Sequence, residues 1–133
     1  MKIYTSYFGN LKKLEKANIM AIGITLYPPR WFYGPNLKDV APTHALFSIS
    51  DAPDEVYNPR FFDEVLSKVD PKEFVERIEM MSKGKDVALC CYEKPNEKCH
   101  RFLVAEWLEK NIGIEVKEFG LSQNPKIVQA SLF

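Results

Sequence analysis

Short apolar runs alternate along the chain with segments that have the apolar spacing of helices. The expected strands cover residues 2–8, 19–26, 44–49, 86–92 and 114–118. Residues 19–26 and 86–92 have the length and apolar composition of strands buried in a parallel sheet. The alternation predicts an α/β fold, with a parallel or mostly parallel sheet of about five strands and helices on both faces.

Asparagine or aspartate stands where each of the expected helices would begin, and both residue types favour the helix N-cap. The expected caps are Asn10, Asn58, Asp70 and Asn96. Glycines at 84 and 113 are expected to end the last two helices. The last helix should cover residues 97–110, which would put Cys99 in its first turn. A helix N-terminus carries partial positive charge, so it would favour a thiolate there.

Residues 27–42 are rich in proline and show no periodicity, which indicates a long loop. Two interpretations of its aromatic residues remain open. They could fold back over the edge of the core. Alternatively the loop could cover a substrate, with Arg30 contacting an anion and Trp31 stacking on the ligand. A third class of function would use residues 27–33 as a contact surface for another protein.

Length and composition indicate one globular domain over residues 1–120, followed by a tail at 121–133 without a clear signal. The 18 basic and 18 acidic residues cancel, so nucleic acid is a possible partner that the charge does not favour. No apolar run is long enough to span a bilayer, and no membrane association is expected. Three cysteines in a chain of 133 residues do not suggest a disulfide scaffold, and a reducing cytoplasmic location is expected.

Polar and reactive residues recur where the expected strands end. In parallel sheets these carboxyl ends share one edge, and ligands bind there. The candidate site residues at this edge are Ser6, Tyr7, Arg30, Trp31, Cys91, Glu93, Cys99, His100 and Arg101. Glu118 ends the last expected strand at the same edge.

Residues 89–101 combine a strand that ends in cysteine, a short loop and a Cys-His-Arg triplet. This pattern resembles the signature of a bacterial, archaeal and phage family, the domain of unknown function 488. The residues that match the signature are Cys91, Glu93, Cys99, His100 and Arg101. Cys90 is an additional cysteine without a counterpart. The resemblance implies an α/β fold and a functional site around the signature, but it supplies no reaction.

One branch of this family is similar in two further segments, Ile-Tyr-Thr-Ser-Tyr-Phe at residues 3–8 and Pro-Pro-Arg-Trp-Phe at residues 28–32. Other branches carry an Asp-Val-Arg element after the second strand. The acidic residue of that element is missing here, and Arg30 approximately replaces its arginine.

The leading hypothesis is an enzyme or ligand-binding domain that acts on a phosphate-bearing or nucleotide-like ligand. The expected ligand-binding residues are Arg101, Arg30, Trp31, Ser6 and Tyr7. The expected catalytic residues are Cys91, Glu93, Cys99 and His100. A cysteine nucleophile is one form of this hypothesis, since Arg101 could lower the pKa of the Cys99 thiol.

Other chemistries remain open. A redox disulfide between Cys91 and Cys99 requires α-carbons within about 7 Å of each other. The residue types would also suit zinc, but adjacent Cys99 and His100 rarely bind one ion and there is no Cys-x-x-Cys motif. We therefore assign no metal ligands and no cofactor from the sequence. The signature residues could also have a purely structural role, as buried thiols and ion pairs.

Overall fold

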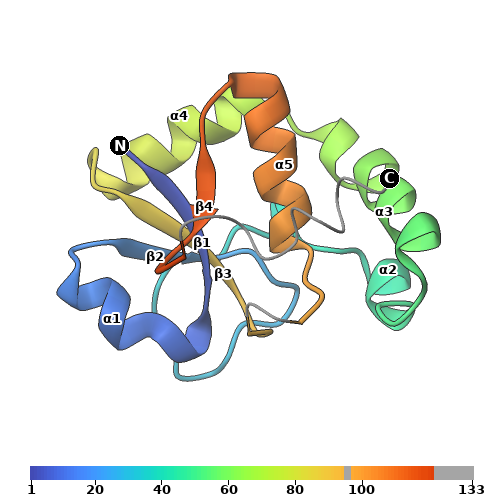
Figure 1. The fold of residues 1–133 in the computed structure, drawn as a ribbon, viewed down its shortest axis with the longest axis horizontal. Helices are drawn as coiled ribbons and strands as arrows, with labels where there is room; N and C mark the ends of the chain where they lie inside the picture. Colours follow the sequence, from blue (N-terminus) through green and yellow to red (C-terminus); the bar gives the residue numbers. More distant parts are fainter. Residues whose placement is uncertain (95–96, 122–133) are drawn as a thin grey trace.

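The computed structural model describes residues 1–94 and 97–121, and its sheet is entirely parallel. The strands are β1 (Ile3–Tyr7), β2 (Met20–Gly23), β3 (Val87–Cys91) and β4 (Val116–Glu118), in the order β2-β3-β1-β4 (Figure 1). The predicted α/β fold with a parallel sheet is confirmed. The described residues contain four strands, one fewer than expected.

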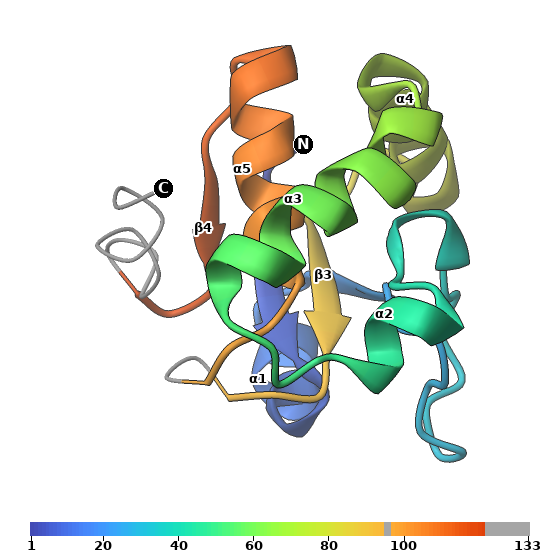
Figure 2. The ribbon, with the colours of Figure 1, turned by 90° about the vertical axis from the view of Figure 1, so that its right-hand side faces the viewer.

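Helices cover the two faces of the sheet unequally. On one face, Leu14 of α1 (Leu11–Lys16) packs against Ala88 and Cys90. On the other face, the larger core surrounds Val87 and Leu89. Its helices are α2 (His44–Ser48), α3 (Asp54–Glu64), α4 (Pro71–Ser82) and α5 (Arg101–Ile112). Figures 1 and 2 show α1 apart from α3, α4 and α5. Successive residues of β3 therefore face different helices.

The prediction of a strand at residues 44–49 is wrong, because this segment forms α2. The Thr43 hydroxyl accepts a hydrogen bond from the backbone N–H of Leu46 at 3.2 Å and caps the helix. Leu46 is the helix residue that enters the core, while Phe47 stays half exposed. One buried position in five residues suits a single helical turn better than a buried strand.

The helix expected to start at Asn58 and Pro59 starts earlier, at Asp54. The carbonyl of Pro53 accepts the N–H groups of Val56 and Tyr57, each at 2.9 Å. Asp54 lies in the first turn, where a negative charge stabilises the helix. Pro59 consequently lies inside α3 rather than at its start.

The caps expected for the first and third helices have different outcomes. Asp70 caps α4 as predicted, since its carboxylate accepts the backbone N–H of Lys72 at 3.0 Å. Asn10 precedes α1, but its side chain does not cap the helix. It donates instead to the hydroxyl of Ser6 at 3.2 Å.

The last helix starts later than predicted. Helix α5 begins at Arg101, so Cys99 precedes the helix instead of lying in its first turn. The carbonyls of Cys99 and His100 accept the first N–H groups of the helix. The expected cap, Asn96, lies outside the described residues, as do residues 122–133 of the expected tail. Gly113 ends α5 as predicted, in a left-handed conformation with φ of 77°.

Strand β2 ends at Gly23, three residues before the predicted end. A Cβ atom added to Gly23 would lie 2.4 Å from Oδ1 of Asn36, so glycine lets the Asn36 side chain approach the end of β2 closely. The Asn36 amide donates to the Thr25 carbonyl at 2.8 Å and accepts its N–H at 3.2 Å. These contacts fix the chain around Ile24, whose carbonyl faces the site described below.

Candidate functional site

The signature residues gather at the carboxyl ends of β1 and β3, two neighbouring strands. After β1 the chain continues into α1 on one face, and after β3 it continues into α5 on the other. Figure 2 shows β3 and β4 pointing toward the same edge, where the chain that joins β3 to α5 passes. Adjacent strands whose connections leave to opposite faces form the usual ligand-binding crevice of a parallel sheet.

Cys91 and Cys99 form a disulfide at this edge. Their α-carbons lie 7.4 Å apart, which is beyond the limit of about 7 Å that the redox alternative required. Both cysteines are buried, with 1% and 7% of their surface exposed, and Phe102 packs against them.

Cys90 lies outside this cluster, because it faces α1 on the other side of the sheet. Burial raises the pKa of its thiol to about 12. The additional cysteine is thus a packing residue, and it differs in environment from its immediate neighbour Cys91.

Arg101 is fully buried and forms an ion pair with Glu118, which is also buried. Arg101 Nε donates to Oε1 of Glu118 at 3.1 Å, and Nη2 donates to Oε2 at 2.9 Å. Thr5 on β1 donates to the same carboxylate at 2.7 Å. The two-pronged geometry fixes the plane of the guanidinium and compensates its charge.

The remaining guanidinium nitrogen, Nη1 of Arg101, contacts the loop after β3. It donates to the sulfur of Cys91 at 2.9 Å and to the backbone carbonyl of Glu93 at 2.7 Å. Arg101 therefore links the strand end, the loop and β4 through one side chain.

His100 presents one ring nitrogen to the backbone and the other to Cys99. Nε2 donates to the carbonyl of Ile24 at 2.5 Å, and this nitrogen must carry the proton because a carbonyl only accepts. Nδ1 lies 3.8 Å from Sγ of Cys99. Burial is the main cause that lowers the pKa of His100 to about 4, with the Arg101 charge acting in the same direction. The imidazole is therefore neutral at pH 7, and the lone pair of Nδ1 faces the sulfur of Cys99.

The structure brings Cys91, Cys99, His100 and Arg101 together. Glu93 joins them through its backbone carbonyl, while its side chain is partly buried. Tyr7 lies beside Cys91 in the sheet register.

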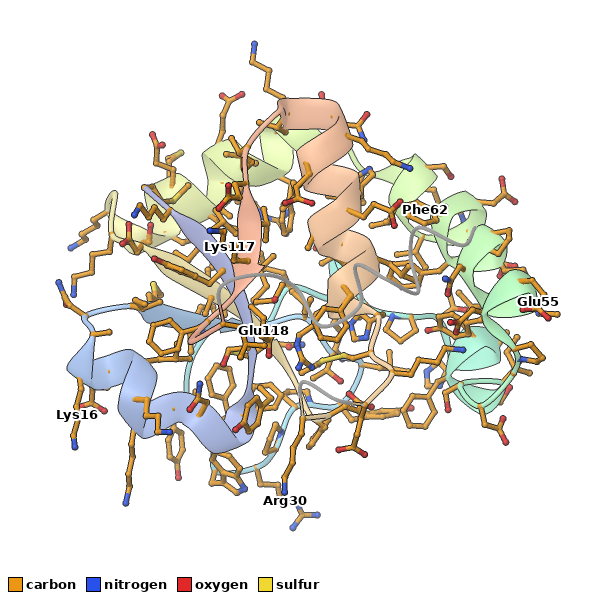
Figure 3. All side chains as sticks on the ribbon, in the orientation of Figure 1. Lys16, Arg30, Glu55, Phe62, Lys117 and Glu118 are labelled. Atoms are coloured by element: carbon orange, nitrogen blue, oxygen red, sulfur yellow. A yellow bond between two sulfur atoms is a disulfide. The ribbon has the colours of Figure 1, made fainter. Side chains whose placement is uncertain are left out.

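Three other predicted site residues lie away from this cluster. Ser6 is buried and bonds to Asn10 near α1, on the side of the sheet opposite Cys91. Arg30 and Trp31 are exposed on the long loop, and Figure 3 shows Arg30 at the periphery and Glu118 well inside. The aromatic residues of that loop differ in burial. Phe32 packs on the core, while Trp31 and Tyr33 stay exposed.

Glu118 and Thr5 are the site residues that the candidate list omitted. The sequence did place Glu118 at the end of a strand on the correct edge. A carboxylate at the carboxyl end of a strand, at the same edge as an arginine of the signature, is the signal for their pairing. Thr5 gave no comparable signal, because threonine is common in strands.

Within the described part of the chain, no helix is both long and apolar enough to cross a membrane. The search of curated proteins found no match, and the search of solved structures found none either.

A family model matches residues 3–112, which include the signature and most of the sheet. The model is DUF488-N3a, described as the active DUF488-N3 subclade. This match and the Cys-x-Glu and Cys-His-Arg signature agree, and the chain belongs to the DUF488 family.

Proposed function

We propose that the protein is a two-cysteine redox catalyst or sensor that works by thiol–disulfide exchange between Cys91 and Cys99. The observation that carries the proposal is the bond between these two signature cysteines, flanked by Arg101 at one sulfur and His100 at the other. Arg101 and His100 contact the two sulfurs of this disulfide, and both cysteines belong to the family signature. Such surroundings suit reversible thiol–disulfide exchange better than a purely structural role.

The two sulfurs have different environments, which suggests different roles. Cys99 is the more exposed, at 7% against 1% for Cys91, and its thiol can donate to Nδ1 of His100. Cys91 receives a hydrogen bond from Arg101, so it is the better leaving thiolate. Cys99 is therefore assigned as the nucleophile and Cys91 as the resolving cysteine.

The exchange with a small disulfide RSSR proceeds in two steps. The Cys99 thiolate attacks one sulfur of RSSR, which forms a mixed disulfide at Cys99 and releases one RS⁻. The Cys91 thiolate then attacks Sγ of Cys99, which forms the Cys91–Cys99 bond and releases the second RS⁻. Each released thiolate takes up a proton according to its own pKa.

The test counts the thiols released from a chromogenic aromatic disulfide by fully reduced, folded protein. The wild type should release two per chain from the pair, and Cys91→Ser should release one and keep a mixed disulfide at Cys99. Cys99→Ser should react much more slowly, and Cys90→Ser should behave like the wild type. Equal release from Cys91→Ser and the wild type, with circular dichroism unchanged, would contradict the proposal.

The earlier expectation of a phosphate-bearing or nucleotide-like ligand remains a prediction. Arg30 and Trp31 are exposed and could contact such a ligand, whereas the charge of Arg101 is already compensated by Glu118. The use of residues 27–33 as a protein contact surface also remains a prediction. Neither is needed for the exchange chemistry proposed here.

A further inference from the structure

Three potential metal ligands converge at the end of β3. The ligand atoms of Cys91, Cys99 and His100 all lie within 4.8 Å of one another. The sequence spacing argued against a common ion for Cys99 and His100. The structure brings their ligand atoms to 3.8 Å by turning the chain before α5, and it adds Cys91 from the strand end.

The orientation of His100 matches that of a metal ligand. A histidine that binds a metal through one nitrogen usually donates its other N–H to a carbonyl or carboxylate. Nε2 of His100 donates to the carbonyl of Ile24, which fixes the ring and leaves Nδ1 to face the sulfurs. Asn36 holds the backbone next to that carbonyl through two hydrogen bonds with Thr25.

The balance of buried charge favours a divalent cation once the disulfide is reduced. The positive charge of Arg101 is already balanced by Glu118. Two thiolates at this site would therefore add two buried negative charges that the Arg101–Glu118 pair does not balance. A divalent ion would cancel both charges. Two thiolates and one imidazole select zinc or a similar thiophilic metal over magnesium or calcium.

The distance between the α-carbons of Cys91 and Cys99 suits two ligands of one metal ion. The α-carbons of Cys91 and Cys99 lie 7.4 Å apart, beyond the usual range of about 4.4–6.8 Å in disulfides. Two thiolates bound to one zinc ion keep their sulfurs further apart than a covalent bond does, so this separation is easily accommodated.

We propose that the reduced protein binds one Zn²⁺ through Sγ of Cys91, Sγ of Cys99 and Nδ1 of His100. Binding to the dithiol releases two thiol protons, and three protein ligands leave a fourth position for water or a substrate. This inference concerns the same thiols as the proposed redox function. The disulfide uses both thiolate ligands, so oxidation and zinc binding exclude each other.

The experiment titrates Zn²⁺ into reduced, metal-free protein in competition with a chromogenic chelator. We expect one Zn²⁺ per chain, none in the oxidised protein, and an affinity at least about tenfold lower in His100→Gln. Cys90→Ser, which changes the cysteine on the other face, should bind like the wild type. Co²⁺ in place of Zn²⁺ should give thiolate charge-transfer absorption and intense visible bands of a tetrahedral site.

Zinc binding that survives oxidation, or that His100→Gln leaves unchanged, would place the ion elsewhere and overturn the inference. Absence of binding by the reduced wild type would also overturn it. If the His100 variant does not fold, the Co²⁺ spectrum of the wild type tests the site instead. A spectrum without thiolate charge-transfer absorption would then overturn the inference. A protein that exchanges disulfides without binding zinc would refute only the metal site, and the reverse result would refute only the redox function.

Discussion

Arg101 is the residue on which the geometry of the site depends. Its guanidinium is fully buried and joins Glu118 on β4, the sulfur of Cys91 and the carbonyl of Glu93. The sequence placed Arg101 in the signature and predicted a ligand-binding role for it at the edge of the sheet, a role that stays a prediction. Its burial depends on Glu118, which lies 17 residues further on and meets it only because β4 pairs with β1.

We predict that Glu118→Gln destabilises the reduced protein by about 3–5 kcal/mol, because it leaves the buried Arg101 charge uncompensated. The double variant Arg101→Met/Glu118→Leu should recover much of that loss, since it removes both charges and keeps the volume. Urea denaturation of the wild type, Glu118→Gln and the double variant measures the free energy of unfolding of each.

Glu64→Gln is the matched control, because Glu64 forms a partly exposed ion pair with Arg60. It should leave the free energy of unfolding almost unchanged. A Glu118→Gln protein as stable as this control would show that the buried pair contributes little.

At the scale of elements, the strand ends position the reactive groups. Strand β2 stops at Gly23, and the chain beyond it turns so that the carbonyl of Ile24 accepts from His100. Strand β3 ends at Cys91, and its alternation puts Cys91 toward α5 and Cys90 toward α1. This alternation follows from the two-residue period of a strand, so it could be read from the sequence.

The element boundaries around the site were harder to predict. Helix α5 was expected to start at residue 97, because the apolar spacing indicated a helix and the preceding asparagine suggested its N-cap. In the structure, Lys98 instead reaches Asp54 at 3.0 Å and the Ala52 carbonyl at 2.6 Å, and helical geometry starts at Arg101. Such tertiary contacts leave no local signal in the sequence.

We predict that Gly23→Ala destabilises the protein by about 1–3 kcal/mol, because the added methyl would lie 2.4 Å from Oδ1 of Asn36. Asn36→Ala removes both the clash and the two hydrogen bonds with Thr25. The double variant should therefore lose less stability than the sum of the single variants. Strict additivity in thermal or urea denaturation would show that Gly23 and Asn36 do not interact in this way.

At the scale of the whole molecule, the strand order decides where the chemistry lies. Because β1 and β3 are neighbours and their following helices cover opposite faces, their carboxyl ends open into one crevice. The sequence predicted the parallel sheet and this edge, since both follow from the alternation of strands and helices. It could not predict the strand order, on which the meeting of Cys91, Arg101 and Glu118 depends.

The most direct test of the central claim is an equilibrium titration of the protein in glutathione redox buffers. The thiols are trapped by alkylation under native conditions and located by peptide mass spectrometry. We predict one reversible two-electron couple that joins Cys91 and Cys99. Cys90, with its pKa raised to about 12 by burial, should be alkylated only after unfolding. If Cys91 and Cys99 both stay reduced in the most oxidising buffer while the fold is intact, or if the bridge includes Cys90, the redox account is wrong.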